Sequence, residues 1–186
     1  MSALLPQHFA VTEAVVVAAG AFAMARTARI NAWWAVGITP FMLAALVGTI
    51  RIGAGLAGDF ELVHQFLSRA GAVFGLGCMV GVMAARTPWL APVLGGAAGI
   101  LAVLIPGAMV PTFLALTLVG SWLAYRAADG QARLVAASFT VLLIGRLATD
   151  PLRAAHPALA WHVFHLAVAL WLLLLAIFVI PRLRAR

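Results

Sequence analysis

The chain has 186 residues, of which 65% are hydrophobic and only 9% are charged, and its net charge is +7. This composition lies outside that of soluble globular domains and predicts an integral membrane protein, with membrane lipids as its partners. All 12 basic residues are arginines at the ends of apolar runs, which argues against nucleic-acid binding and, because lysine is absent, against a retinal Schiff base.

Hydropathy divides the chain into seven apolar segments, each of which we interpret as a transmembrane helix. The segments lie at about 10–27, 34–57, 64–85, 88–105, 108–125, 132–149 and 158–180. The fourth and fifth are separated by a predicted tight turn at Pro106 and Gly107. Four tryptophans fit the aromatic belts at the membrane surfaces: Trp33, Trp34, Trp89 and Trp161. We therefore predict an all-α, polytopic membrane protein with one seven-helix transmembrane domain over residues 1–186.

The placement of the arginines predicts the orientation of this bundle. Eight of them stand at alternate connections and at the C-terminus: Arg26, Arg29, Arg86, Arg126, Arg133, Arg182, Arg184 and Arg186. By the positive-inside rule these sites are cytoplasmic. The N-terminus is then outside and the C-terminus cytoplasmic, which requires an odd number of helices.

Most of the other ionisable residues fall at the opposite, outer end of the predicted bundle. They are Glu13, Arg51, Asp59, Glu61, His64, Arg69, Arg146, Asp150, Arg153, His156, His162 and His165, whereas Asp129 is the one acid on the cytoplasmic side. Polar loops account for part of this set. They account less well for Glu13, Arg51, Arg69, His162 and His165, because these stand a turn or more inside apolar runs, and snorkelling by the two arginines reduces this excess without removing it. Ionisable groups at such depth are costly and indicate a functional site.

Glycines recur at helix-packing spacings in the third and fourth predicted helices. They are Gly71 and Gly75, Gly77 and Gly81, and then Gly95, Gly96 and Gly99. Small residues four apart let two helices approach closely in a membrane. We interpret these glycines as packing positions without a functional role.

Three histidines form the candidate metal site. His162 and His165 are three residues apart near the start of the last helix and therefore share one face. His64 stands where the second and third predicted helices meet the same side of the membrane. A catalytic zinc site commonly uses three protein ligands, often histidines, with water in the fourth position. The sequence therefore predicts zinc on His64, His162 and His165.

Three further polar residues near His64 are the candidate catalytic groups. Asp59 and Glu61 could act as a fourth ligand, as a general base or as the acceptor that fixes a histidine tautomer. Ser68, four residues after His64, could hydrogen-bond a water molecule or an oxyanion. A zinc ion lowers the pKa of its water, so hydrolysis of an ester or amide is the simplest reaction. No GxSxG, HExxH or P-loop motif indicates another mechanism.

Two alternatives remain open at this stage. The histidines could only hydrogen-bond carboxylates and the backbone, which would make the chain a non-enzymatic membrane subunit or sensor with a structural polar cluster. They could instead be axial ligands of a haem, with His64 paired with His162 or His165. A transporter is disfavoured, because the chain is short and shows no interrupted helices in matching halves.

The seven-helix pattern and two motifs resemble a known superfamily. The motifs are GDFELVHQF, with a histidine at the outer end of the second helix, and AWHVFHLAVA, which opens the last helix. They resemble the superfamily of alkaline ceramidases and progestin and adiponectin receptors, and in particular uncharacterised bacterial seven-helix proteins at its edge. With the small size of the chain, this resemblance implies a location in the bacterial inner membrane.

For that superfamily the resemblance implies a zinc ion held by one histidine of the second helix and two of the seventh, and amide hydrolysis of a lipid. Carried over by position, the ligands are His64, His162 and His165. The chain departs from the pattern in three ways. Its last two histidines are three apart instead of four, Phe60 replaces the expected serine, and no aspartate follows His64 at the expected place. The implied function is a zinc-dependent membrane hydrolase of a lipid-like amide or ester, with its site near the outer face.

Overall fold

The computed structural model describes residues 6–84, 87, 89–127 and 132–183, and within these ranges the chain forms helices joined by short turns. The predicted number of seven helices is confirmed for this part of the chain, and three of the helices contain or begin with a differently wound turn. In order, the elements are α1 (His8–Thr27), α2 (Ala32–Gly53), α3 (Asp59–Phe66) continued by the π-helical turn η1 (Leu67–Gly71) and by α4 (Ala72–Ala84), α5 (Leu90–Leu104), the 3-10 turn η2 (Pro106–Ala108) with α6 (Met109–Ala127), α7 (Ala132–Ala155), and α8 (Pro157–Leu174) continued by the π-helical turn η3 (Leu175–Val179) and by α9 (Ile180–Leu183).

Five of these helices are long and apolar enough to cross a membrane: His8–Thr27, Ala32–Gly53, Asp59–Ala84, Pro106–Arg126 and Pro157–Val179. The other two differ from them in length or polarity. α5 is apolar but has 15 residues, about 22 Å of helix against a hydrocarbon core of roughly 30 Å. α7 is long enough but includes Arg133, Arg146, Asp150 and Arg153. Seven membrane spans, and their orientation, therefore stay predictions.

The connection between α2 and α3 differs from the sequence prediction. α2 ends at Gly53 rather than near 57, and α3 begins at Asp59 rather than near 64. Gly55 and Gly58 have φ angles of 65° and 67°, a region that L side chains rarely adopt, so the chain leaves the helix there. Asp59 and Glu61 lie in the first turn of α3, where carboxylates interact favourably with the helix dipole. His64 is consequently in the second turn of this helix.

Two other boundaries show what hydropathy alone can resolve. The predicted turn at Pro106 is confirmed, because η2 occupies that position between α5 and α6. α7 extends six residues past its predicted end at 149 and includes Pro151, because hydropathy marks the apolar part of a helix and not its polar last turns. Three arginines used for the orientation, Arg86, Arg184 and Arg186, lie outside the described residues, as does Asp129.

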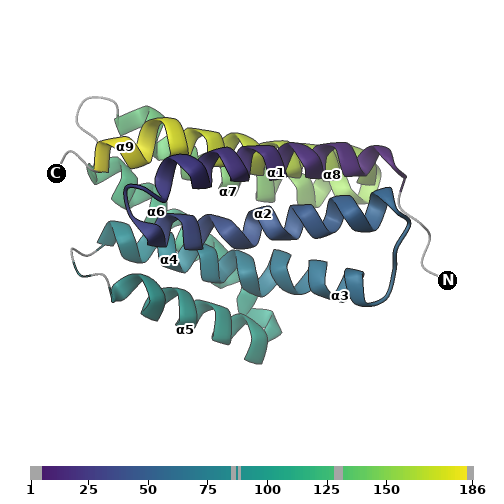
Figure 1. Cartoon of the computed structure of the whole chain (residues 1–186), viewed down its shortest axis with the longest axis horizontal. Coiled ribbons are helices and arrows are strands. Elements are labelled where there is room, and N and C mark those ends of the chain that lie inside the picture. Colours follow the sequence, from purple (N-terminus) through teal and green to yellow (C-terminus); the bar gives the residue numbers. More distant parts are fainter. Residues whose placement is uncertain (1–5, 85–86, 88, 128–131, 184–186) are drawn as a thin grey trace.

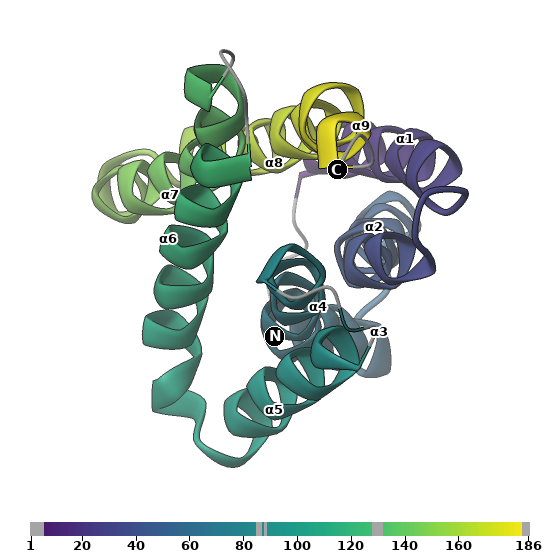
Figure 2. The ribbon, with the colours of Figure 1, turned by 90° about the vertical axis from the view of Figure 1, so that its left-hand side faces the viewer.

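The helices run lengthwise beside one another, and α1 begins at the opposite end of the bundle from the end of α9 (Figure 1). α1, α3 and α8 begin at one end, called here the N-terminal end, and α2 and α7 end there (Figure 1). Viewed along the bundle, α4 lies inside an arc formed by α2, α5 and α6, while α8 lies between α1 and α7 (Figure 2). This arrangement brings the first helix of the chain against the last.

The glycines of α4 and α5 pack as predicted, with one exception. A Cβ atom on Gly77 would lie 2.8 Å from the Cα of Gly95, and one on Gly81 would lie 2.6 Å from the Cα of Ala91. Only hydrogen side chains allow these two backbones to approach so closely. Gly96 is the exception, since a Cβ there would meet nothing within 4 Å.

Candidate functional site

A cavity of about 620 Å³ lies near the N-terminal end of the bundle, among α2, α3, η1, α6, α7 and α8, and it reaches α1 at Glu13. Its volume is within the range of small-molecule sites. Exposed residues of the α2–α3 connection and of α7 line it, among them Leu56 and Arg153, so the cavity opens at this end. Its deeper wall carries apolar side chains that include Phe41, Phe113 and Leu142.

Glu13 is the buried acid at the inner side of this cavity. It stands in the second turn of α1 and its side chain is 1% exposed. The facing position on α2 is Gly48, where an added Cβ would lie 2.5 Å from Oε1 of Glu13 and 3.0 Å from Cε1 of His64. Glycine at position 48 therefore makes the space in which the carboxylate sits. Oε1 of Glu13 is buried without a hydrogen-bond partner.

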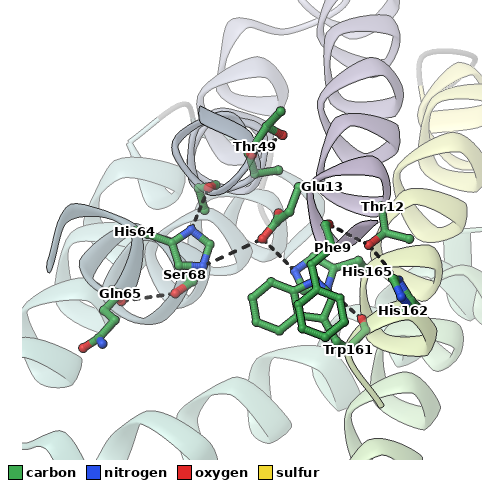
Figure 3. Close-up of polar contacts among 12 residues, drawn as sticks. Phe9, Thr12, Glu13, Thr49, His64, Gln65, Ser68, Trp161, His162 and His165 are labelled. Atoms are coloured by element: carbon green, nitrogen blue, oxygen red, sulfur yellow. Dashed lines mark hydrogen bonds and ion pairs between the residues drawn. The ribbon is translucent and has the colours of Figure 1, made fainter. Parts of the chain in front are cut away.

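Two histidine rings point at this carboxylate oxygen (Figure 3). Nε2 of His165 is 3.2 Å from Oε1 of Glu13, and Nε2 of His64 is 3.9 Å from the same atom. The other nitrogen of each ring lies against a backbone carbonyl. Nδ1 of His64 is 2.9 Å from the oxygen of Ala44, and Nδ1 of His165 is 2.7 Å from the oxygen of Trp161.

These carbonyl contacts fix the tautomers of both rings. A carbonyl oxygen only accepts hydrogen bonds, so Nδ1 of His64 and Nδ1 of His165 must each carry a proton and donate it. In the neutral ring Nε2 then has a lone pair. Two such lone pairs and the oxygen of Glu13 meet at one place, and three acceptors are compatible there only if a proton or a metal cation lies among them.

The third predicted ligand, His162, is not brought to this point. Its Nδ1 lies 3.1 Å from Oγ1 of Thr12, and its ring centroid is 5.2 Å from that of His8. The hydroxyl of Thr12 donates to the carbonyl of Phe9 at 3.1 Å, so it accepts from His162. A three-residue step along α8 turns the two rings about 60° apart, and only His165 faces Glu13.

Trp161 covers the Glu13, His64 and His165 cluster on the side nearer the opening of the cavity. Its ring stacks on His165 at a centroid distance of 4.5 Å and on Phe9 at 5.3 Å (Figure 3). The side chain is half-buried and lines the cavity, rather than lying free at the membrane surface as an interfacial tryptophan would. Trp34, assigned to the same belts, is 1% exposed and belongs to the core.

The predicted catalytic residues separate into two groups. Glu61 and Ser68 line the cavity together with His64, as the helical spacing predicts. Glu61 accepts a hydrogen bond from Gln65 at 3.3 Å, and the hydroxyl of Ser68 donates to the carbonyl of Gln65 at 3.3 Å. Asp59 is exposed at the start of α3 and is not among the residues that line the cavity.

Sequence reasoning noted Glu13 as an acid inside an apolar helix but did not include it among the site residues. The position of Glu13 well inside an apolar helix could have identified it, since a buried carboxylate in a membrane helix needs a cationic or hydrogen-bonding partner.

Within the described ranges, no group of three or more His, Cys, Asp and Glu side chains is arranged as a ready-made metal site. The chain matches no family model, no curated protein and no solved structure.

Proposed function

We propose that the protein is a zinc-dependent membrane hydrolase that acts on a lipid-like amide or ester in the cavity described above. The single observation that carries the proposal is the meeting of two Nε2 atoms, from His64 and His165, at a buried oxygen of Glu13 that has no hydrogen-bond partner. The zinc ligands are then Glu13, His64 and His165, with Glu13 in place of the predicted His162.

The chemistry of these residues suits a zinc ion, and the two separations from Glu13 support the proposal, although the three side chains are not arranged as a ready-made metal site. Zinc takes histidine nitrogen and carboxylate oxygen ligands, and two histidines with one glutamate form a known catalytic set. Ligand atoms of a tetrahedral site lie about 3.3 Å apart, given metal distances of roughly 2.0–2.1 Å. The separations of 3.2 Å and 3.9 Å from Glu13 lie on either side of that value. The Nδ1–carbonyl bonds also match the way in which metal-bound histidines are held.

When bound, zinc would lower the pKa of a water molecule and polarise the carbonyl of an amide or ester. The chain itself supplies the remaining requirements. Phe41, Phe113 and Leu142 provide an apolar wall for an acyl chain. Glu61 is the other carboxylate among the lining residues that the structure describes, and its oxygens can accept a proton from an attacking water. The hydroxyl of Ser68 also belongs to a lining residue, and because its proton is donated to Gln65 it can accept a hydrogen bond from a substrate.

The proposal includes the placement in a membrane. Seven spans with the N-terminus outside would put the N-terminal end of the bundle, and with it the cavity, at the outer face of a bacterial inner membrane. The arginines at the opposite connections support this orientation. The resemblance to ceramidases and to progestin and adiponectin receptors supports the reaction class and remains part of the proposal.

Metal analysis of the protein purified in dodecyl maltoside tests the proposal. We expect about one zinc ion per chain, and we expect Glu13→Gln and His165→Gln to lose it. His156→Gln is the matched control, because His156 is exposed between α7 and α8 and does not line the cavity. A fluorogenic N-dodecanoyl amide measures hydrolysis, which His165→Gln should abolish and His156→Gln should leave unchanged.

The alternatives give different results in the same experiment. The proposal would be contradicted if the wild-type protein held no zinc and the His165→Gln variant lost only thermal stability. Glu13 and His165 would then be a structural pair that shares a proton. A Soret band would identify a haem protein. The structure does not favour haem, because the carboxylate of Glu13 occupies the space that faces both rings.

A further inference from the structure

Two residues that line the cavity each carry a buried hydrogen-bond donor without a partner, in addition to the acceptor on Glu13. They are Nε of Arg51 and Nε1 of Trp161. Both groups can only donate, and a donor that is buried and unpaired is costly. In the described part of the chain the other side-chain atoms of this kind are Oγ1 of Thr27 and Nε1 of Trp171, neither of which belongs to a residue that lines the cavity.

The two residues that carry these donors stand on their helices about one turn nearer the opening than Gly48 and His165. Arg51 follows Gly48 by three residues on α2, which ends at the N-terminal end. Trp161 precedes His165 by four residues on α8, which begins there. One turn is about 5.4 Å along a helix axis. A group that meets both donors would thus lie next to the cluster, on the side of the opening.

The charges around the cavity favour a negative group. Arg51, Arg69 and Arg153 line the cavity, whereas its acids in the described residues are Glu13 and Glu61. Glu13 faces the histidines, and Glu61 accepts from Gln65. Among the described residues, the ion pair between an arginine and an acid is that of Arg146 with Asp150. It involves neither Arg51 nor any residue that lines the cavity. Arg51 therefore has a positive charge available to a ligand.

Beyond the Glu13 cluster, apolar side chains make up much of the wall. Val16, Phe41, Phe113, Leu142, Phe164 and Val168 line the deeper part of the cavity. A ligand that uses both parts has an acyl chain at one end and an anionic head at the other. An anion without a chain would leave the apolar wall uncovered, and a chain without an anion would leave the donors on Arg51 and Trp161 unpaired.

We propose that the cavity binds a lipid that carries a carboxylate, with the carboxylate on Arg51 and Trp161 and the acyl chain along the apolar wall. Arg153, at the opening, adds a second positive charge. The inference rests on the proposed function and narrows its substrate class to acyl amides or esters whose head group carries a carboxylate. It can nevertheless be tested by binding alone, without zinc or turnover.

The probe is dodecanoate, with dodecanol as its neutral counterpart and acetate as the head group without a chain. Binding to the full-length protein in dodecyl maltoside is measured by calorimetry. We expect dodecanoate to bind at least tenfold more tightly than dodecanol, and acetate to show no binding. We expect Arg51→Gln and Trp161→Phe to weaken dodecanoate binding at least tenfold and to leave dodecanol binding unchanged.

Two further variants keep the result interpretable. Arg153→Gln changes an exposed side chain, so the fold is retained, and it should weaken dodecanoate binding several-fold. Arg26→Gln removes an arginine that lies over the ring of Phe22 near the opposite end of the bundle and should have no effect. Equal affinity for dodecanoate and dodecanol would overturn the inference, as would unchanged binding in Arg51→Gln and Arg153→Gln, because water alone would then satisfy the two donors.

Zinc content measured on the same preparations separates this inference from the proposed function. Protein that holds zinc but binds dodecanoate without regard to Arg51 would refute the carboxylate site and leave the hydrolase proposal standing. Protein without zinc whose dodecanoate binding depends on Arg51 would support the carboxylate site and refute the metal centre.

Discussion

Glycine has opposite roles in two regions: the contact between α4 and α5, called here the seam, and the cavity beside α2. At the seam, Gly77 and Gly81 bring one backbone against another, and no space remains between the helices. At the cavity, Gly48 leaves room for the carboxylate of Glu13 and for the ring of His64. The first arrangement stabilises the bundle, while the second accommodates charge that an apolar bundle would otherwise exclude.

The difference shows why glycine spacing alone does not indicate function. Gly77 and Gly81 stand four apart in a small-xxx-small pattern, which identified them as packing positions from the sequence. Gly48 has no glycine four residues away on either side, and its importance comes from a residue on another helix. Substitutions that add a side chain at each glycine should therefore separate stability from metal binding.

The largest expected effect is at the seam. Gly77→Leu would force its side chain into the backbone of Gly95, where even a Cβ would lie 2.8 Å from Cα. Because backbone cannot move aside as a flexible side chain can, we expect a loss of about 3 kcal/mol or more. The measurement is the yield of monodisperse protein and its melting temperature in detergent.

Gly96→Leu is the matched control for this substitution, since the same helix pair is involved and a Cβ at Gly96 meets nothing within 4 Å. It should fold as wild type does. If both leucine variants gave the same melting temperature, the close approach of α4 and α5 would not contribute to stability.

An intermediate effect is expected at Gly48. Its change to alanine places a methyl group 2.5 Å from Oε1 of Glu13, so the carboxylate must move away from His165. Displacing a ligand or its support typically costs 10–100-fold in metal affinity, and we expect a loss of this size for zinc, measured by competition with a chelating dye.

Gly53→Ala serves as the control on the same helix, because a Cβ at Gly53 would meet nothing within 4 Å. Its zinc affinity should equal that of wild type. Retention of full affinity in Gly48→Ala would show that Glu13 is not a ligand, whatever the metal content of the protein.

The smallest effect concerns the histidine that the structure turns away from the cluster. His162→Gln should keep its zinc and lose about 1 kcal/mol of stability, the typical contribution of one hydrogen bond, here to Thr12. Metal analysis and thermal melting measure the two quantities, with His165→Gln as the contrasting variant. Loss of zinc in His162→Gln would restore the histidine triplet predicted from the sequence.

The sequence predicted the helices of this fold because each has a long apolar run. It placed the turn at Pro106 correctly, since proline and glycine interrupt the helical pattern there. It misplaced the end of α2 and the start of α3, because hydropathy does not register the left-handed conformations of Gly55 and Gly58. The polarity of α7 likewise leaves its relation to the membrane a prediction.

The site was only partly predictable, for a geometric reason. His64 and His165 were identified by residue type and by their common level in the bundle, and the structure turns both toward Glu13. Whether His162 or His165 faces inward depends on the rotation of α8 about its axis, which is set by the packing of α1 and α7 against it. That rotation leaves no local signal in the sequence, so the contact of His165 rather than His162 with Glu13 could be found only from the fold.

The pairing of the first helix with the last has a consequence for biogenesis. Glu13 is synthesised before His165, because α1 precedes α8 in the chain with the other long helices between them. During that interval α1 holds a carboxylate whose partner on α8 does not yet exist, and an unpartnered charge makes membrane insertion less favourable. Synthesis of α8 supplies this partner, so the order of the helices along the chain delays the pairing of Glu13 until α8 is present.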